Sequence, residues 1–234
     1  MTDAHKNRAV IITSYLEYPL DIPALTRAGD YIVCLDGGWD IARQQGVRAD
    51  LLLGDFDSIQ GPLPGEDGGP KVLRYPPEKD YTDLELALRV LDADTTPDVL
   101  IIGGLGGRLD QTIINVQMLA RYTGDPFDRI ELMDGHNRCF VLHGGAQEEG
   151  PCIIPSQPDS YLSLLPLTEE CTGVYLQGAK YPLSDAVLHK SASIGISNEF
   201  YADQAELRLA RGTLLVVISK GNENDISIPS WKRV

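Results

Sequence analysis

Two aspartates, Asp55 and Asp57, lie in the segment GDFDS directly after the apolar run Leu51–Leu53. On an extended backbone, alternate side chains point to the same side, so we expect both carboxylates to lie together at the end of a strand. Paired carboxylates repel each other and lose hydration unless a cation or a hydrogen-bond donor compensates. A hard divalent cation is the natural partner. For this segment alone, an acidic turn capped by Ser58 is the simpler alternative.

A second segment whose residues could take part in chemistry is GGLGGRLDQ, which starts at Gly103 after an apolar run. Glycines fill four of its first five positions, and such a loop can hold phosphate oxygens with its amide groups. It matches neither the dinucleotide pattern GxGxxG nor the P-loop pattern. The guanidinium of Arg108 can grip a phosphate with two hydrogen bonds and oppose charge that develops during its transfer. A salt bridge between Arg108 and Asp110 is the structural alternative.

Two further polar segments adjoin predicted strands. Asp36, Gly37 and Gly38 follow the apolar run 31–35, and two glycines there allow a ligand to approach the backbone closely. An ordinary turn between a strand and a helix explains the same tripeptide. The segment KDYTDLELAL begins at Lys79 and carries a capping box from Thr82 to Glu85. Capping does not account for its first two residues, KD, so a helix start that faces a ligand is an equal interpretation.

The elements that must position these residues alternate between strand and helix in the first half of the chain. Short apolar runs predict strands, and amphipathic stretches between them predict helices. The expected strands are 10–12, 31–35, 51–53, 71–75 and 98–103, and the expected helices are 21–28, 39–46, 82–91 and 109–122. A parallel sheet brings the carboxyl ends of its strands to one edge, where α/β folds bind ligands. Clustered carboxylates, a phosphate cradle and a cation at one edge indicate metal-dependent transfer of a phosphoryl or pyrophosphoryl group.

The second half of the chain has a different pattern. Short apolar runs are separated by Gly, Pro and Asn, and no long helical period occurs. Antiparallel strands are expected at 130–133, 139–142, 152–154, 161–165, 173–177, 193–196, 205–209 and 214–219. We therefore predict a Rossmann-like α/β domain over residues 1–125, followed by an all-β sandwich domain over residues 126–234.

Composition limits the possible partners. The chain has 234 residues, 43% of them hydrophobic, with a formal net charge of −14 and a pI near 4.6. An acidic surface argues against nucleic acid and anionic membranes, which carry the same sign. The four cysteines show no CxxC spacing, and no apolar run reaches the roughly 18 to 20 residues of a membrane span. The first eight residues are polar, without a signal-peptide core. We expect a cytoplasmic location.

The ordered set of motifs resembles the thiamine pyrophosphokinase family over nearly the whole chain. The motifs are DGG at Asp36, GDFDS at Gly54, KDYTDLELAL at Lys79, GGLGGRLDQ at Gly103 and GISNEF at Gly195. The resemblance implies an N-terminal α/β catalytic domain, a C-terminal β-sandwich, and a homodimer whose active sites lie between subunits. It also implies the reaction: ATP and thiamine give AMP and thiamine diphosphate, with the thiamine hydroxyl attacking the β-phosphorus.

The resemblance also implies roles for individual residues. The Mg²⁺ ligands would be Asp55, Asp57 and Asp83. Catalytic roles would fall to Asp57, Asp80, Arg108 and Asp110, with Arg108 stabilising the transferred group. The residues around the nucleotide would be Asp36, Gly37, Gly38, Lys79, Thr82, Gly104, Gly106 and Gly107. In the β domain, Ser197 and Asn198 would bind the aminopyrimidine, and Tyr181 would stack on the cationic heterocycle or serve only as a structural tyrosine. Asp57 and Asp110 are both candidate bases, and metal-assisted proton loss is a third possibility.

Two positions depart from the family pattern. Gln111 stands where the family commonly has His, which argues against proton transfer there, and Trp39 is larger than the residue expected after DGG. A pyrophosphokinase acting on a pterin alcohol could share the phosphate-binding segments, and the segment GISNEF favours thiamine instead. A non-catalytic sensor of nucleotide or thiamine diphosphate is a third hypothesis. The presence of all the expected carboxylates and of Arg108 favours catalysis.

Overall fold

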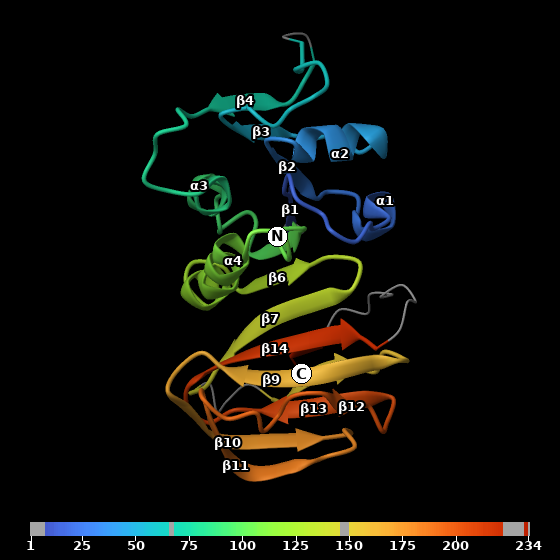
Figure 1. Ribbon diagram of the computed structural model, residues 1–234, viewed down its shortest axis with the longest axis vertical. Coiled ribbons are helices and arrows are strands. Elements are labelled where there is room, and N and C mark those ends of the chain that lie inside the picture. The colour runs from blue at the N-terminus through green and yellow to red at the C-terminus, as the bar shows by residue number, and fades with distance from the viewer. Residues whose placement is uncertain (1–7, 66–67, 146–149, 222–231, 234) are drawn as a thin grey trace, which may run out of the picture. The chain divides into compact units, whose positions relative to one another are not determined.

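The computed structural model describes residues 8–65, 68–145, 150–221 and 232–233. The chain divides into two compact units, residues 1–134 and residues 135–234. The first unit alternates strands and helices, and the second consists of strands (Figure 1). The units are described separately below.

The first unit is built on a parallel sheet in the order β6-β5-β1-β2-β3-β4. Its strands are β1 (Arg8–Ile12), β2 (Tyr31–Leu35), β3 (Leu51–Gly54), β4 (Lys71–Arg74), β5 (Asp98–Ile102) and β6 (Arg129–Met133). Four of the five residues in β1, β2, β5 and β6 are buried. Continuous burial of this kind is typical of parallel strands covered on both faces.

Helices cover this sheet. They are α1 (Ile22–Leu25), α2 (Gly38–Gln44), α3 (Asp83–Val90) and α4 (Leu109–Tyr122). In Figure 1, α1 and α2 lie on one side of the sheet and α3 and α4 on the other. The α3 helix buries four of its apolar residues, and the Thr82 side chain accepts a hydrogen bond from the amide of Glu85. The capping box therefore starts α3 directly beside the predicted ligand-facing residues.

The predicted alternation of strands and helices in this unit is confirmed, with two corrections. The helix expected at 21–28 is only one turn, Ile22–Leu25. The backbone between Asp55 and Asp57 is not extended, because β3 ends at Gly54 and Phe56 has φ 72°. A left-handed residue, and not strand alternation, therefore sets the directions of these two side chains.

The second unit contains two sets of antiparallel strands. One has the order β12-β9-β14-β7 and the other the order β11-β10-β13-β8-β15. The strands are β7 (Asn137–His143), β8 (Cys152–Pro155), β9 (Ser160–Pro166), β10 (Glu170–Gln177), β11 (Leu183–His189), β12 (Asn198–Glu199), β13 (Gln204–Arg208), β14 (Thr213–Lys220) and β15 (Lys232–Arg233). The longest pairing runs between β14 and its neighbours β7 and β9.

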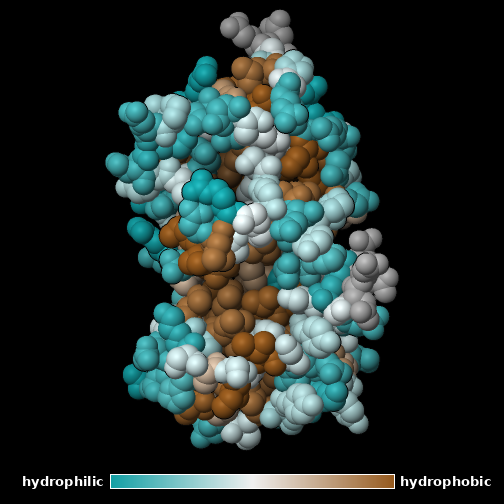
Figure 2. All heavy atoms as spheres, viewed as in Figure 1, coloured by the Kyte–Doolittle hydropathy of each residue, from teal (hydrophilic) through white to brown (hydrophobic). Residues whose placement is uncertain are grey.

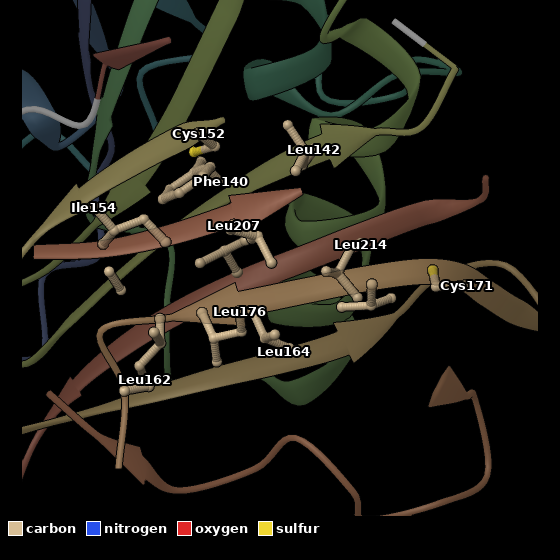
Figure 3. Packing of buried hydrophobic residues seen from close by; sticks show 14 of the residues in the cluster. Phe140, Leu142, Cys152, Ile154, Leu162, Leu164, Cys171, Leu176, Leu207 and Leu214 are labelled. Atoms are coloured by element: carbon tan, nitrogen blue, oxygen red, sulfur yellow. The ribbon is translucent and has the colours of Figure 1, made fainter. Parts of the chain in front are cut away.

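Both sets of strands contribute side chains to one hydrophobic core. Phe140 and Leu214 come from the first set, and Leu176 and Leu207 from the second. Figure 3 shows these side chains packed against one another. Buried residues alternate with more accessible ones along β9, where Ser160, Leu162, Leu164 and Pro166 are buried. Burial of this shared face stabilises the unit through the hydrophobic effect.

Two strand predictions for the second half are wrong. The run at 130–133 is β6, which pairs in parallel with β5 in the first unit and is not an antiparallel strand. Its apolar pattern fits either kind of strand, and only the tertiary pairing distinguishes them. Residues 193–196 form turns and no strand. Ser193 and Gly195 interrupt the apolar residues there, and Gly195 has φ 98°.

All four cysteines are buried free thiols. Burial raises the pKa of the Cys34 thiol to about 12, with a smaller contribution from the charge of Asp50, so this thiol stays protonated at neutral pH. Among the described residues, no helix combines the length and apolar character needed to cross a membrane.

Truncation of Phe140 tests the importance of the shared β core. This side chain is fully buried among residues of both strand sets. We expect Phe140→Ala to lower the free energy of unfolding by about 3 to 5 kcal/mol through lost burial and a residual cavity. Urea denaturation gives the value. The exposed Tyr201 provides the control, and Tyr201→Ala should change stability by less than about 0.5 kcal/mol. Equal effects of the two changes would contradict a core role for Phe140.

Candidate active site

Three carboxylates gather where β2 and β3 end. One carboxylate oxygen from each of Asp36, Asp55 and Asp57 lies within 4.8 Å of the others. Asp36 follows β2 and is only 8% exposed, whereas Asp57 is exposed. The parallel pairing of β2 with β3 places the two strand ends side by side. The sequence predicted Asp55 and Asp57 as a pair, and the sheet adds Asp36 to them.

The backbone around this cluster is shaped to hold it. The amide of Phe56 donates to Asp36 Oδ1 at 2.9 Å, and the amide of Asp57 donates to Asp55 Oδ1 at 3.2 Å. Gly54 has φ 146°, and a Cβ at this position would collide with the carboxylate of Asp36. Glycine is therefore required at position 54 for both conformation and space.

The cluster changes the acidity of Asp36. Burial raises its pKa to about 6, the hydrogen bond from the Phe56 amide opposes this rise, and the nearby carboxylates of Asp83 and Asp55 add to it. Desolvation and like charge both disfavour an ionised carboxylate. The ionised cluster therefore has a free-energy cost that a bound cation can offset.

One lysine partly compensates the cluster. Lys79 Nζ lies 2.8 Å from Asp83 Oδ1 and 3.8 Å from Asp55 Oδ2. Burial lowers the pKa of Lys79, but the hydrogen bond and charge of Asp83 together with the charge of Asp55 raise it overall. Asp83 thus pairs with Lys79 and lies outside the group of three carboxylates. Asp80 is exposed just before the helix start.

The glycine-rich loop lies between β5 and α4. Its four glycines, Gly103, Gly104, Gly106 and Gly107, all have positive φ. The ring of Tyr15 lies against Gly107, and the amide of Gly104 donates to the carbonyl oxygen of Tyr15 at 2.8 Å. Glycine is needed here both for its backbone conformation and for close approach to the segment that follows β1.

Arg108 and Asp110 form an exposed pair at the start of α4. The Arg108 guanidinium donates to both carboxylate oxygens of Asp110, at 3.1 Å and 2.6 Å, and 74% of its side chain is exposed. The hydrogen bond from Arg108 lowers the pKa of Asp110, which makes this carboxylate a weaker base. The position of Arg108 agrees with both interpretations, a salt bridge to Asp110 and a grip on phosphate, because an exposed guanidinium can move from Asp110 to a ligand.

Residues from several of these segments line a cavity of about 240 Å³. Its lining includes Asp36, the α3 start at Thr82 and Asp83, and Gly104 of the glycine-rich loop. Gln111, which departs from the family pattern, also lines this cavity. The sequence interpretation missed a further part of the lining, Thr13, Ser14, Tyr15 and Asn115. A polar TSY segment directly after a predicted strand was the available signal for the first three.

The predicted residues of the second unit also lie together. Asn198 is 5% exposed, and its Oδ1 accepts hydrogen bonds from the amides of Tyr181 and Glu199 at 3.0 Å and 2.9 Å. Its Nδ2 donates to the Tyr181 carbonyl oxygen at 2.8 Å. Ser197 has φ 56°, and its amide donates to Ser163 Oγ. Asn198 therefore holds the backbone of Tyr181, whose side chain is 62% exposed.

Comparison with known proteins places this geometry in a family. Residues 22–131 match the family model for the thiamin pyrophosphokinase catalytic domain, and residues 152–214 match the model for its vitamin B1 binding domain. The chain belongs to the thiamine pyrophosphokinase family. It is 33% identical over 203 residues to a thiamine pyrophosphokinase of Bacillus subtilis, which covers 85% of this chain and 92% of that relative. The resemblance of the five ordered motifs to this family is thus confirmed.

Solved structures of thiamine pyrophosphokinases agree with the fold. The enzyme from Geobacillus thermodenitrificans superimposes with a TM-score of 0.76 and 27% identity, over 91% of this chain and 97% of that structure. The enzyme from Bacillus subtilis gives a TM-score of 0.79 at 24% identity, over 92% of this chain and 99% of that structure. At 24% identity, the similarity to the Bacillus subtilis structure shows a shared fold.

The acidity of Asp36 leads to a stability prediction for the metal-free protein. Because the pKa of Asp36 is higher in the folded state, ionisation destabilises the fold as pH rises from about 4 through 6. We expect Asp36→Asn to raise the free energy of unfolding at pH 7.5 by roughly 1 to 3 kcal/mol, and the gain to shrink towards pH 4.5. Urea denaturation in EDTA measures both.

The exposed Asp94 supplies a matched control for this prediction. Asp94→Asn makes the same change of charge outside the cluster and should alter stability by less than about 0.5 kcal/mol at either pH. A loss of stability in Asp36→Asn at pH 7.5 would mean that the hydrogen bond from Phe56 outweighs the repulsion.

Proposed function

We propose that this protein transfers the pyrophosphoryl group of ATP to the hydroxyl of thiamine, in a Mg²⁺-dependent reaction that gives thiamine diphosphate and AMP. The observation that carries this proposal, in a chain of this family, is the cluster of Asp36, Asp55 and Asp57, whose member Asp36 lines a cavity together with Gly104 of the glycine-rich loop. Carboxylates alone repel a polyphosphate, and a divalent cation between them reverses the interaction.

The residues present fit a magnesium ion. Mg²⁺ binds oxygen ligands, and three carboxylates with oxygens close together provide them at a cost in repulsion that a cation relieves. We assign Asp55 and Asp57 as ligands with Asp36 as the third carboxylate. Direct ligation by Asp83 stays a prediction, since Asp83 is paired with Lys79 here. When bound, the ion neutralises phosphate charge and orients the transferred group.

The phosphates are held by backbone and cationic groups. The glycine-rich loop, through Gly104, Gly106 and Gly107, offers a close approach to phosphate oxygens, and Gly37 and Gly38 do the same after β2. Lys79 and Thr82 contribute from the start of α3, with the exposed Asp80 beside them. Arg108 leaves Asp110 to bind the transferred group and stabilise its developing charge. Before the substrate binds, Asp110 orients Arg108 through the hydrogen-bonded pair.

The chemical step joins the thiamine hydroxyl oxygen to the β-phosphorus. The bond from this phosphorus to the oxygen shared with the α-phosphate breaks, and AMP leaves with that electron pair. The hydroxyl proton passes to a carboxylate of the site. Asp57 and Asp110 are the two candidates for this role, and the hydrogen bond from Arg108 lowers the pKa of Asp110 and weakens it as a base.

Thiamine is bound by the second unit in this proposal. The exposed ring of Tyr181 is suited to stack on a cationic heterocycle. Asn198 holds the Tyr181 backbone, and Ser197 directly precedes Asn198 in the sequence. We interpret this unit as a β-sandwich that binds thiamine, and the first unit as a Rossmann-like domain that binds nucleotide and metal. The boundary between them lies in the range 125–135.

We also propose a cytoplasmic homodimer with active sites between subunits. Large apolar side chains are exposed on the second unit, among them Val187, Ile194 and Ile196. Figure 2 shows hydrophobic residues that reach the surface among hydrophilic ones on one face. Exposed apolar groups of this kind support association between subunits. Sedimentation analysis of the purified protein measures the assembly state.

Removal of one metal ligand tests the catalytic proposal. We expect Asp57→Asn to reduce thiamine diphosphate formation by at least about a thousandfold, because it removes a ligand of the metal ion and one candidate base while keeping the side-chain shape. The assay measures AMP and thiamine diphosphate from ATP, thiamine and Mg²⁺, with EDTA and no-thiamine controls. Asp94→Asn is the matched change of charge and should keep full activity. Unimpaired turnover in Asp57→Asn would remove Asp57 from the mechanism.

The wild-type assay also separates the alternatives. Equal amounts of AMP and thiamine diphosphate, formed only with metal, support pyrophosphoryl transfer to thiamine. If ATP binds and neither product forms, pterin alcohols are the next acceptors to test. Binding of ATP without turnover of any acceptor would favour the sensor hypothesis.

Changes at Tyr181 test the thiamine site. We expect Tyr181→Ala to raise the KM for thiamine about tenfold through loss of stacking, with the KM for ATP unchanged. Tyr181→Phe keeps the ring and should behave nearly as wild type. The exposed Tyr201 is a matched control, and Tyr201→Ala should leave both KM values unchanged. An unchanged KM for thiamine in Tyr181→Ala would show that Tyr181 is only a structural tyrosine.

A further inference from the structure

The side chain of Asn115 contacts the glycine-rich loop from the buried face of α4. Asn115 is 6% exposed, and the other buried residues of this helix, Met118, Leu119 and Tyr122, are hydrophobic. Its Nδ2 donates to the carbonyl oxygen of Gly104 at 2.8 Å. A buried amide group costs free energy unless it is hydrogen-bonded. The contact with Gly104 therefore accounts for a polar residue on this face of the helix.

Two further contacts hold the same loop. Thr112 Oγ1, also on α4, donates to the carbonyl oxygen of Gly106 at 3.0 Å. The amide of Gly104 donates to the carbonyl oxygen of Tyr15 at 2.8 Å. A Cβ at position 104 would lie only 2.8 Å from the Asn115 amide nitrogen, so the loop and the side chain of Asn115 fit each other closely. The loop is thus fixed at two carbonyl groups by α4 and at one amide by the segment after β1.

The contacts with α4 set the directions of two peptide groups. In a trans peptide, the carbonyl group and the following N–H point in opposite directions. Because the carbonyl groups of Gly104 and Gly106 point to side chains of α4, the N–H groups of Leu105 and Gly107 point away from those side chains. Within the part of the chain that the structure describes, neither N–H donates a hydrogen bond to another group. Free N–H groups of a loop are the donors that an anion such as phosphate binds.

We propose that Asn115 and Thr112 are positioning residues for phosphate binding, because they turn the peptide groups of the glycine-rich loop so that its amides face the phosphates of the nucleotide. The inference rests on the proposed function, since it takes this loop as the phosphate-binding part of the site. Asn115 and Gly104 line the same cavity as Asp36 of the carboxylate cluster. The amide of Asn115 is neutral, so it holds the loop without adding a negative charge beside the phosphates.

Two exchanges at Asn115 test this role. Asn115→Leu removes the donor at similar size, and Asn115→Asp keeps the shape but directs an acceptor at the Gly104 carbonyl. We expect both to weaken calorimetric binding of inorganic tripolyphosphate with Mg²⁺ about tenfold, and to raise the KM for ATP by a similar factor. The KM for thiamine at saturating ATP should stay within about threefold. Gln117→Leu makes the matched exchange at an exposed position of α4 and should leave every value unchanged.

Exchanges at Thr112 test the hydrogen bond itself. Thr112→Val removes the hydroxyl and keeps the shape, whereas Thr112→Ser keeps the hydroxyl. We expect tripolyphosphate binding to weaken about threefold in Thr112→Val and to be unchanged in Thr112→Ser. Equal losses in the two variants would overturn the hydrogen bond as the cause.

The remaining outcomes separate this inference from the proposed reaction. Circular dichroism checks the fold of each variant. Unchanged tripolyphosphate affinity in both Asn115 variants, no tripolyphosphate binding by the wild type, or equal losses for tripolyphosphate and thiamine would overturn the inference. An inactive wild type whose tripolyphosphate binding still weakens in the Asn115 variants would overturn the reaction and keep the positioning role.

Discussion

Electrostatic repulsion among carboxylates is the constraint on which the rest of this site depends. Asp36, Asp55 and Asp57 bring their oxygens within 4.8 Å of one another, and Asp36 does so while buried. Such a cluster persists only because the surrounding fold holds it. The left-handed turn at Phe56 directs an amide to Asp36, and Gly54 leaves room for that carboxylate. The stability that the metal-free fold loses here becomes affinity for a cation.

The parallel sheet turns this local cost into a binding site. The segments that follow β1, β2, β3 and β5 meet at one edge, where the strand order changes direction between β1 and β5. Ser14 lines two cavities, one that includes Gly104 of the glycine-rich loop and one beside α2. Ligands of α/β folds bind at this type of position because helix starts and loop amides converge there.

In the second unit, hydrogen bonds from a buried amide side chain position the candidate ligand-binding residue. Asn198 is buried and uses its amide group to hold the backbone at Tyr181, so a buried polar residue positions an exposed aromatic side chain. A buried amide with satisfied hydrogen bonds fixes local geometry. The shared core of the two strand sets gives the backbone around Tyr181 and Asn198 a rigid support.

The sequence by itself determined the alternation of strands and helices, the capping of α3 and the family, because periodicity, capping residues and ordered motifs are local signals. It did not determine that β6 is a parallel strand of the first unit, since apolar runs look alike in both kinds of sheet. Only the tertiary structure decided that Asp36 joins Asp55 and Asp57 while Asp83 pairs with Lys79. Distances between side chains from separate strands depend on strand order and on single left-handed residues such as Phe56, which spacing along the chain does not encode.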